Sequence, residues 1–303
     1  MADSARFTRF SPRTWPTWLL LALLWLVSKL ASYRVALGIG RQLGRIGYRV
    51  AARRRHITEV NISLCFPNLT PAEQSELVRQ HFESIGIGLL MLGFSWWASD
   101  KKLQPLSHVT GLEHLDRSLQ QGKGVLMLGM HFIDLDLVGR ILRRHHPFAV
   151  VYRKHENPVI EYAFSHYRTK HFSRAIPRED VRAVLRALKQ NQIVWIAPDQ
   201  AMRGKHSLLA PFFGVPAATT TIISRIARLS GAPVLLGFGY RLPGNQGYLF
   251  EAQPPLQEFP GESVESDTAR VNLEIEKAAR IAPEQYLWSH RRFKRRRGLP
   301  NPY

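Results

Sequence analysis

The sequence is poor in cysteine and lacks an obvious reactive thiol. Its only cysteine among 303 residues is Cys65, which excludes an internal disulfide and any zinc site built from several thiolates. A chain without disulfides is typical of a reducing compartment. No histidine stands beside Cys65 to activate it, so we interpret this thiol as buried and unreactive.

Acidic residues are scarce relative to basic ones. The chain carries 42 Lys and Arg against 23 Asp and Glu, a formal net charge of +19. Such an excess indicates acidic partners: nucleic acid, an anionic membrane, a phosphorylated lipid or an acidic protein. The basic residues are spread along the chain without a recognisable nucleic-acid-reading motif, which argues against nucleic acid. Internal repeats and low-complexity linkers are absent too, which favours one main domain.

Charge is nearly absent from residues 14–33, TWPTWLLLALLWLVSKLASY, where Lys29 is the only charged side chain. About 20 apolar residues are enough to span a bilayer, and the tryptophans of this stretch suit its interfaces. No small-residue cleavage site follows, so a removed signal peptide is not indicated. We therefore predict an N-terminal membrane anchor over residues 1–33 and a globular body over residues 34–303. A helix lying in the membrane interface is the alternative.

Arginines flank this apolar stretch unevenly. Three precede it, whereas seven lie between Arg34 and Arg55. The positive-inside bias then places the globular body in the cytoplasm. Arg41, Arg45 and Arg49 recur at helical intervals, so they are placed to rest on anionic headgroups just inside the membrane.

Beyond residue 109 short apolar runs alternate with amphipathic segments, the pattern of an α/β fold. Short strands are expected at residues 148–152 and 193–197, and a helix at residues 157–171. Before this region, residues 81–97 (HFESIGIGLLMLGFSWW) form a long apolar stretch that contains glycines and two adjacent tryptophans. This stretch is compatible with a helix that lines a groove for an acyl chain or with a helix packed in the core.

The segment GVLMLGMHFIDLDLVGR, residues 124–140, carries the first chemical signal. Its short apolar run predicts a buried strand that ends just before His131, at the edge where parallel sheets bind ligands. Asp136 follows in an H-x-x-x-x-D spacing, one helical turn on. An imidazole oriented by a carboxylate can deprotonate a hydroxyl. Asp134 is the competing partner but resembles a helix cap; the plainer interpretation is that His131 caps the helix while Asp136 faces solvent.

Asp199 also follows a predicted strand and should face the same edge of the sheet as His131. Arg203, Lys205 and His206 come after it, a combination suited to a polar head group. Alternatively, Asp199 binds Arg203 or caps a turn. Arg168 lies on the predicted helix at residues 157–171, where spacing alone indicates an ordinary solvated arginine.

Several motifs together resemble the late (secondary) acyltransferases of lipid A biosynthesis, the lauroyl and myristoyl transferase family. The likeness runs from Trp15 to Tyr303. It rests on NISLCFP at residues 61–67, HFIDLD at 131–136, IVWIAPDQ at 193–200, PFFGVPAATTT at 211–221 and APEQYLWSHRRFKRRRGLP at 282–300. The last motif is the most specific. Lauroyl-type members usually carry Glu at the position of Asp136, whereas the related glycerolipid acyltransferases use Asp.

This resemblance implies acyl transfer from an acyl carrier protein thioester to a hydroxyl of a lipid A precursor, at the cytoplasmic face of the inner membrane. It makes His131 the general base and Asp136 its orienting acid. It places Arg168 near the acceptor phosphate or the developing oxyanion and makes Asp199 a second functional acid. It calls for no metal or bound cofactor, and it implies an α/β/α sandwich of the glycerolipid acyltransferase type.

Two further interpretations follow from the resemblance. The basic cluster RRFKRR, residues 291–296, is expected to bind either the acidic acyl carrier protein or lipid phosphates. A related enzyme that acylates a phosphatidylinositol mannoside, a lysophospholipid or an ornithine lipid would keep the same H-x-x-x-x-D motif, but the HRRFK signature argues against it.

Overall fold

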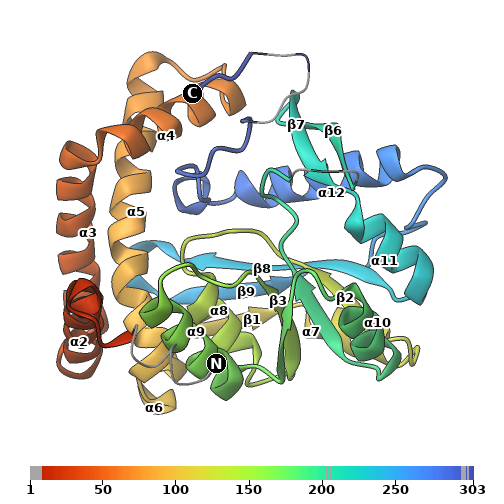
Figure 1. Cartoon of the computed structure of the whole chain (residues 1–303), viewed down its shortest axis with the longest axis horizontal. Helices are drawn as coiled ribbons and strands as arrows, with labels where there is room; N and C mark the ends of the chain where they lie inside the picture. The colour runs from red at the N-terminus through yellow and green to blue at the C-terminus, as the bar shows by residue number, and fades with distance from the viewer. Residues whose placement is uncertain (1–8, 203, 205, 295–297, 299) are drawn as a thin grey trace.

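The computed structural model describes residues 9–202, 204, 206–294, 298 and 300–303. Its helices and strands alternate over most of the chain, as Figure 1 shows. The helices are α2 (Trp15–Leu30), α3 (Tyr33–Val50), α4 (Ala52–Cys65), α5 (Pro71–Trp97), α6 (Asp100–Leu103), α7 (Leu112–Leu119), α8 (Leu135–Leu142), α9 (Pro158–His171), α10 (Val181–Lys189), α11 (Ile222–Ser230) and α12 (Val264–Ala279). The strands are β1 (Ser107–Thr110), β2 (Val125–Leu128), β3 (Phe148–Tyr152), β4 (Arg174–Pro177), β5 (Ile193–Ile196), β6 (Ser207–Phe212), β7 (Val215–Thr220), β8 (Val234–Arg241) and β9 (Tyr248–Ala252).

A mixed sheet forms the centre of the molecule. Its seven strands stand in the order β1-β9-β8-β2-β5-β3-β4, and β6 pairs with β7 in a separate hairpin. β9 is antiparallel to β8, whereas β8, β2, β5, β3 and β4 all run in one direction. The carboxyl ends of these five strands therefore meet at one edge of the sheet.

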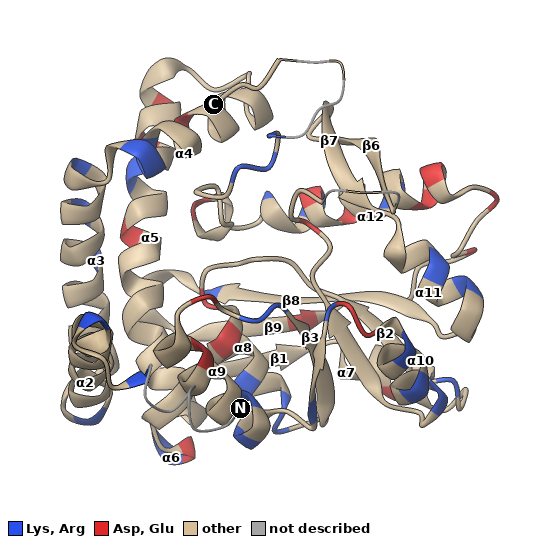
Figure 2. Ribbon diagram, in the orientation of Figure 1, with Lys and Arg blue, Asp and Glu red and all other residues tan. Residues whose placement is uncertain are grey.

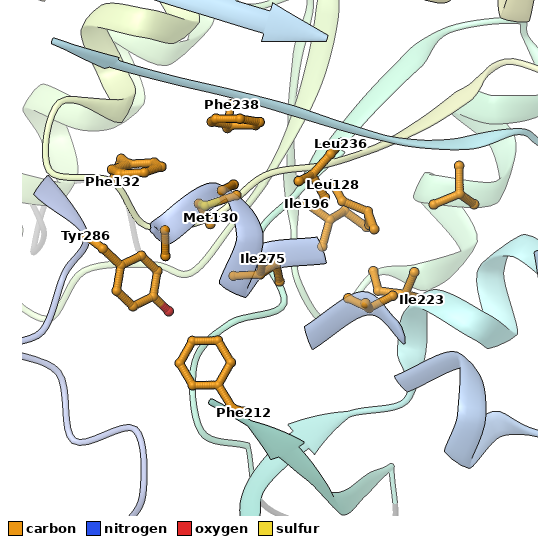
Figure 3. Packing of buried hydrophobic residues seen from close by; sticks show 14 of the residues in the cluster. Leu128, Met130, Phe132, Ile196, Phe212, Ile223, Leu236, Phe238, Ile275 and Tyr286 are labelled. Atoms are coloured by element: carbon orange, nitrogen blue, oxygen red, sulfur yellow. The ribbon is translucent and has the colours of Figure 1, made fainter. Parts of the chain in front are cut away.

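Helices cover both faces of the sheet, so the fold has three layers. Val125 and Met127 of β2 point to the face covered by α7 and α8, while Leu126 and Leu128 point to the face covered by α10, α11 and α12. Figure 3 shows Leu128 and Phe238 of the sheet on the same side as Ile275 of α12. Alternate residues of a strand face opposite ways, which explains why β2 is buried on both sides. The structure confirms the predicted α/β class and the three-layer arrangement.

Most of the apolar stretch near the N-terminus forms a single helix, α2, which ends at Leu30. α2 covers 16 residues, and α3 begins at Tyr33 after a break capped by the Ser32 side chain. Leu24 is buried against the body, with 2% of its surface exposed. Of the helices in the described ranges, none has both the length and the apolar character needed to cross a membrane. The predicted span over residues 14–33 is therefore not formed as one helix.

Glycines let two helices, α2 and α3, approach α5 closely. A Cβ added at Gly44 of α3 would lie 2.2 Å from the Phe82 carbonyl oxygen, and one at Gly86 of α5 would lie 2.1 Å from the Gly40 carbonyl oxygen. A Cβ at Gly93 would lie 2.8 Å from the Leu24 carbonyl oxygen of α2. Only small residues allow backbones to pack at such distances. The glycines of the stretch at residues 81–97 thus serve helix packing in the core.

A buried ion pair fixes the loop that follows β2. Asp134 is 5% exposed and accepts hydrogen bonds from the Tyr248 hydroxyl at 2.9 Å and from Nη1 of Arg241 at 3.3 Å. Nη2 of Arg241 reaches the Ser84 hydroxyl of α5 at 3.3 Å. Burial raises the pKa of Asp134, while the Arg241 charge and the Tyr248 hydroxyl act against that rise. Asp134 occupies the predicted N-cap position of α8, but its side chain makes no capping hydrogen bond there and binds Tyr248 and Arg241 instead.

Replacing Asp134 should therefore cost stability. We expect Asp134→Ala to lower the free energy of unfolding by about 3–5 kcal/mol, because it leaves the buried Arg241 charge without its carboxylate. Urea unfolding in mild detergent measures this change. Asp116→Ala is the control, since the Asp116 side chain is 57% exposed, and its effect should stay within about 0.5 kcal/mol. Equal effects of the two changes would show that the ion pair contributes nothing.

Candidate active site

The register of two neighbouring strands brings His131 and Asp199 together. Leu128 of β2 pairs with Ile196 of β5, and the strands are parallel. His131 and Asp199 each lie three residues beyond this pair, at the same edge of the sheet. The amide of Gly129 also donates to the Ile196 carbonyl at 2.8 Å, which continues the pairing past the strand ends. The two side chains consequently leave the sheet side by side, as expected for the ligand-binding edge of an α/β fold.

The contact between these residues uses both carboxylate oxygens of Asp199. Nδ1 of His131 lies 2.6 Å from Oδ1, and the backbone N–H of His131 donates to Oδ2 at 2.8 Å. The Tyr286 hydroxyl supplies a further hydrogen bond to the carboxylate. Asp199 is 2% exposed, whereas 28% of the His131 side chain is open. A carboxylate at Nδ1 holds the proton on that nitrogen, which leaves Nε2 as the hydrogen-bond acceptor.

Each member of this pair shifts the pKa of the other. Burial raises the pKa of Asp199, but the His131 charge and the hydrogen bonds of its ring and backbone outweigh burial and lower that pKa to about 2. Burial lowers the pKa of His131, but the Asp199 charge and hydrogen bond outweigh it, so that pKa lies above its ordinary value. Asp199 therefore stays charged at neutral pH and stabilises the imidazolium form of His131.

Asp136 does not occupy the position predicted for it beside the imidazole. Nδ1 of His131 is taken by Asp199, and no hydrogen bond joins Asp136 to His131 in the described part of the chain. The hydrogen bond comes from a residue 68 positions away along the sequence, which the spacing inside one segment does not reveal. Asp136 lies in the first turn of α8, where burial raises its pKa and the Arg168 charge acts against this rise. Its catalytic role stays a prediction.

Arg168 is not a solvated helix residue. Its guanidinium group stacks 4.7 Å from the centre of the Phe164 ring and 5.2 Å from that of Tyr152. Nη1 is buried and makes no hydrogen bond to any described residue. The positive charge of this guanidinium group acts to lower the pKa of the Asp136 carboxyl, and both residues line the same cavity. Two aromatic rings thus hold an unpaired donor in position for a bound group with negative charge.

The cavity has a volume of about 990 Å³ and runs along the carboxyl edge of the sheet. His131, Asp136 and Arg168 are among its polar groups. Its apolar wall lies between α8 and the sheet and includes Leu142, Phe148, Phe172, Trp195 and Phe250. α5 contributes no residue to this lining, so of the two interpretations of residues 81–97 the structure favours a helix packed in the core. That helix instead packs in the core, with Ile87, Met91 and Phe94 buried.

The basic cluster at residues 291–296 is partly structural. Arg292 is 3% exposed and donates to the Ala218 carbonyl at 2.9 Å and to the Thr219 hydroxyl at 2.7 Å. Phe293 is fully buried, while residues 295–297 lie outside the described part of the chain. Arg292 therefore fastens the C-terminal segment to β7 and is not available to a partner. Cys65 is buried, and burial raises the pKa of its thiol, as expected for an unreactive cysteine.

The structure tests the expected roles of Asp199 and of the basic residues that follow it to different extents. Asp199 binds His131 and Tyr286, so its expected role as a structural turn cap is not what its side chain does. Arg203 and Lys205 lie outside the described residues. His206 lines the cavity and lies 2.7 Å from Nη1 of Arg225 through its Nδ1 atom. Tyr286 was not singled out from the sequence, although it lies within the specific motif at residues 282–300.

Comparison with known proteins identifies the family. The family described as "Bacterial lipid A biosynthesis acyltransferase" matches residues 6–295. The chain is 37% identical to the "Lipid A biosynthesis lauroyltransferase" of Escherichia coli (strain K12) over 96% of each chain. It is 36% identical to the "Lipid A biosynthesis palmitoleoyltransferase" of the same strain, over 98% of this chain and 97% of the relative. Among solved structures, 1-acyl-sn-glycerophosphate acyltransferase PlsC from Thermotoga maritima aligns with 75% of this chain and 96% of its own at 14% identity and a TM-score of 0.37.

The match extends over nearly the whole chain and includes His131, Asp136, Arg168 and Asp199. The protein is an acyltransferase, and it belongs to the bacterial lipid A biosynthesis acyltransferase family.

Proposed function

We propose that this enzyme transfers a fatty acyl chain from an acyl carrier protein thioester to a hydroxyl of a lipid A precursor, with His131 as general base. The observation that carries the proposal is the 2.6 Å contact between His131 Nδ1 and Asp199 beside a cavity with an extended apolar wall. The names of the relatives support lipid A as the acceptor. The three-layer fold is in keeping with a sandwich of the glycerolipid acyltransferase type.

The reaction follows from this arrangement. Nε2 of His131 takes the proton of the acceptor hydroxyl while the hydroxyl oxygen attacks the thioester carbonyl. The attack produces a tetrahedral intermediate whose former carbonyl oxygen carries the negative charge. When this intermediate collapses, it expels the thiolate, which receives the proton from the imidazolium. Asp199 holds the ring and stabilises the imidazolium between these steps. The thioester is already activated, so placement and charge stabilisation supply most of the catalysis.

Arg168 binds a negatively charged group of the reactants, and the apolar wall binds the acyl chain of the donor. The unpaired Nη1 of Arg168 binds negative charge, either of the oxyanion or of an acceptor phosphate. Burial raises the pKa of the Asp136 carboxyl and the Arg168 charge acts against this rise, so the two groups interact electrostatically. Leu142, Phe148 and Phe172 offer the donor chain an apolar path between α8 and the sheet.

We infer that the enzyme acts at the cytoplasmic face of the inner membrane, which it contacts through α2 and α3. On α3 an apolar stripe faces outward; its members are Val35 (53% exposed), Ile39 (40%), Leu43 (40%), Ile46 (54%) and Val50 (74%). Leu19, Leu23 and Leu30 are exposed on α2. Arg34 and Arg49 flank this stripe, while Arg45 is paired with Glu83 at 2.9 Å. Exposed apolar stripes flanked by arginines are typical of helices that lie in an anionic interface.

Loss of the base tests the proposed function. We expect His131→Ala to lower the rate of acyl transfer to a tetra-acylated lipid A precursor by about 10²–10⁴-fold, the usual contribution of a general base. Turnover is measured with acyl carrier protein thioesters and the product by mass spectrometry. His145→Ala is the matched control because His145 is exposed. Near-normal transfer by the His131 variant, or acylation of another lipid only, would refute the proposal.

The pH dependence of kcat/KM distinguishes the roles of Asp199 and Asp136. The Asp199 charge raises the pKa of His131, and the base acts in its neutral form, so activity rises with pH through that pKa. Asp199→Asn removes the charge, so the acid limb of kcat/KM should move to lower pH, together with a reduced maximum. Asp136→Asn should leave the position of that limb nearly unchanged. A shift caused by the Asp136 change and not by the Asp199 change would make Asp136 the partner of His131.

The stripe on α3 gives a test of membrane contact. The triple change Ile39→Gln/Leu43→Gln/Ile46→Gln should weaken partition of the full chain into phosphatidylglycerol-containing vesicles by about tenfold or more, since each side chain loses apolar burial. The matched control is Leu229→Gln/Leu273→Gln/Ile281→Gln, because these residues of other surfaces are 71%, 48% and 48% exposed. Equal loss by both variants, or loss by neither, would contradict a specific role for α3.

A further inference from the structure

A second concentration of positive charge lies where β3 and β4 end. Arg153 and Lys154 follow β3, Arg178 follows β4, and α10 and α11 begin beside them. We call this surface the basic rim; its members are Arg153, Lys154, Arg178, Arg182, Arg186 and Arg225. All six are exposed. Figure 2 shows basic segments along α10 and on α11 at this side of the molecule.

The charges of the basic rim are only partly balanced. Arg153 lies 3.2 Å from Glu156, Arg178 lies 2.7 Å from Glu179 and Arg186 lies 3.9 Å from Asp180. These carboxylates are themselves 91%, 69% and 46% exposed, so such pairs contribute little to stability. Arg182 and Lys154 form no ion pair with any described residue. The rim therefore keeps an excess of positive charge at a solvent-exposed surface.

This surface is continuous with the cavity that holds His131. Arg153, Lys154 and Arg178 line the cavity themselves, and so do Val181 and Val184 of α10. Because β2, β5, β3 and β4 are parallel, their carboxyl ends place His131 and the rim along one edge of the sheet. A partner bound on the rim can thus pass a flexible arm into the cavity without crossing a wall of the protein.

The position of the rim residues on α10 and α11 favours a soluble protein over a membrane lipid as the partner. Figure 1 is drawn with the longest axis horizontal, and it places α2 and α3 at one end of that axis and α10 and α11 at the other. The apolar stripe of α3 therefore lies away from the part of the rim on α10 and α11, whereas Arg153 and Lys154 lie closer to the helices at that end, because Asn157 donates to the Thr17 hydroxyl of α2 at 3.2 Å. When the stripe rests on a membrane, Arg182, Arg186 and Arg225 remain open to partners from the aqueous side.

We propose that the basic rim docks the acidic carrier protein that delivers the acyl thioester. This proposal rests on the proposed function and replaces residues 291–296 as the expected docking site. Opposite charges on two surfaces steer association and set its orientation more than they add raw affinity. The rim orients the carrier so that its thioester arm enters the cavity beside Arg153 and Arg178 and reaches His131.

The test compares two donors that carry the same acyl chain. One is the acyl carrier protein thioester and the other is the uncharged acyl-pantetheine thioester, which needs no docking surface. The measured quantity is the ratio of kcat/KM with the carrier donor to kcat/KM with the small donor. For Arg182→Glu/Arg186→Glu in the full chain, we expect this ratio to fall about tenfold or more and its dependence on salt to weaken. Arg182→Gln/Arg186→Gln should give an intermediate fall.

A matched control changes the net charge equally at the opposite edge of the sheet. Arg117→Glu/Lys123→Glu alters two exposed cations that lie near the amino end of β2, and its ratio should match that of the wild type. An equal fall for both variants would show an effect of net charge alone and overturn the proposal. A raised KM for the lipid acceptor with either donor would assign the rim to lipid phosphates and overturn it too. Failure of the wild type with both donors would instead refute the proposed function.

Discussion

The common direction of five strands is the constraint on which the site depends. β8, β2, β5, β3 and β4 all end at one edge of the sheet, so residues far apart in sequence meet there. The paired register of β2 and β5 places His131 and Asp199 within hydrogen-bond distance. The apolar side chains of both sheet faces keep this register fixed, because a slip by one residue would turn every buried side chain to the wrong face.

The carboxylates of Asp199, which is buried, and of Asp136, which is half-buried, experience different surroundings. Asp199 receives hydrogen bonds from the ring and backbone of His131 and from Tyr286, and these lower its pKa despite burial. For Asp136, burial raises the pKa and, among the described residues, the Arg168 charge opposes that rise without cancelling it. A carboxylate that stays ionised can hold an imidazolium, whereas one that is protonated more easily cannot do so as well. The surroundings therefore favour Asp199 for the role at Nδ1.

Much of this arrangement is predictable from local sequence. The apolar runs at residues 125–130, 148–152 and 193–197 are short and bounded, and they form β2, β3 and β5 with small differences at their ends. That His131 and Asp199 share an edge follows from the rule that parallel strands end together. Which acid, Asp199 or Asp136, contacts Nδ1 of His131 depends on which strands are neighbours in the sheet. Neither sequence segment alone determines that strand order.

Other features depend on tertiary contacts that periodicity does not reveal. The glycines of α5 allow close helix packing, but the same pattern also fits a ligand groove. Arg292 lies in a run of basic residues, yet its guanidinium is buried against β7. The apolar stretch at residues 14–33 has enough residues for a membrane span, but α2 covers only 16 of them and ends at Leu30, before a break capped by Ser32. For the glycines and Arg292, the packing partner decides the outcome.

The most direct test of the central claim is ¹⁵N nuclear magnetic resonance of the histidine rings. The protein has 12 histidines, and the His131 signals are assigned by their loss in His131→Gln. The account predicts a neutral ring with its proton on Nδ1, a pKa above the ordinary histidine value, and a fall of that pKa in Asp199→Asn. A ring protonated on Nε2, or a pKa unaffected by Asp199→Asn but lowered by Asp136→Asn, would contradict it.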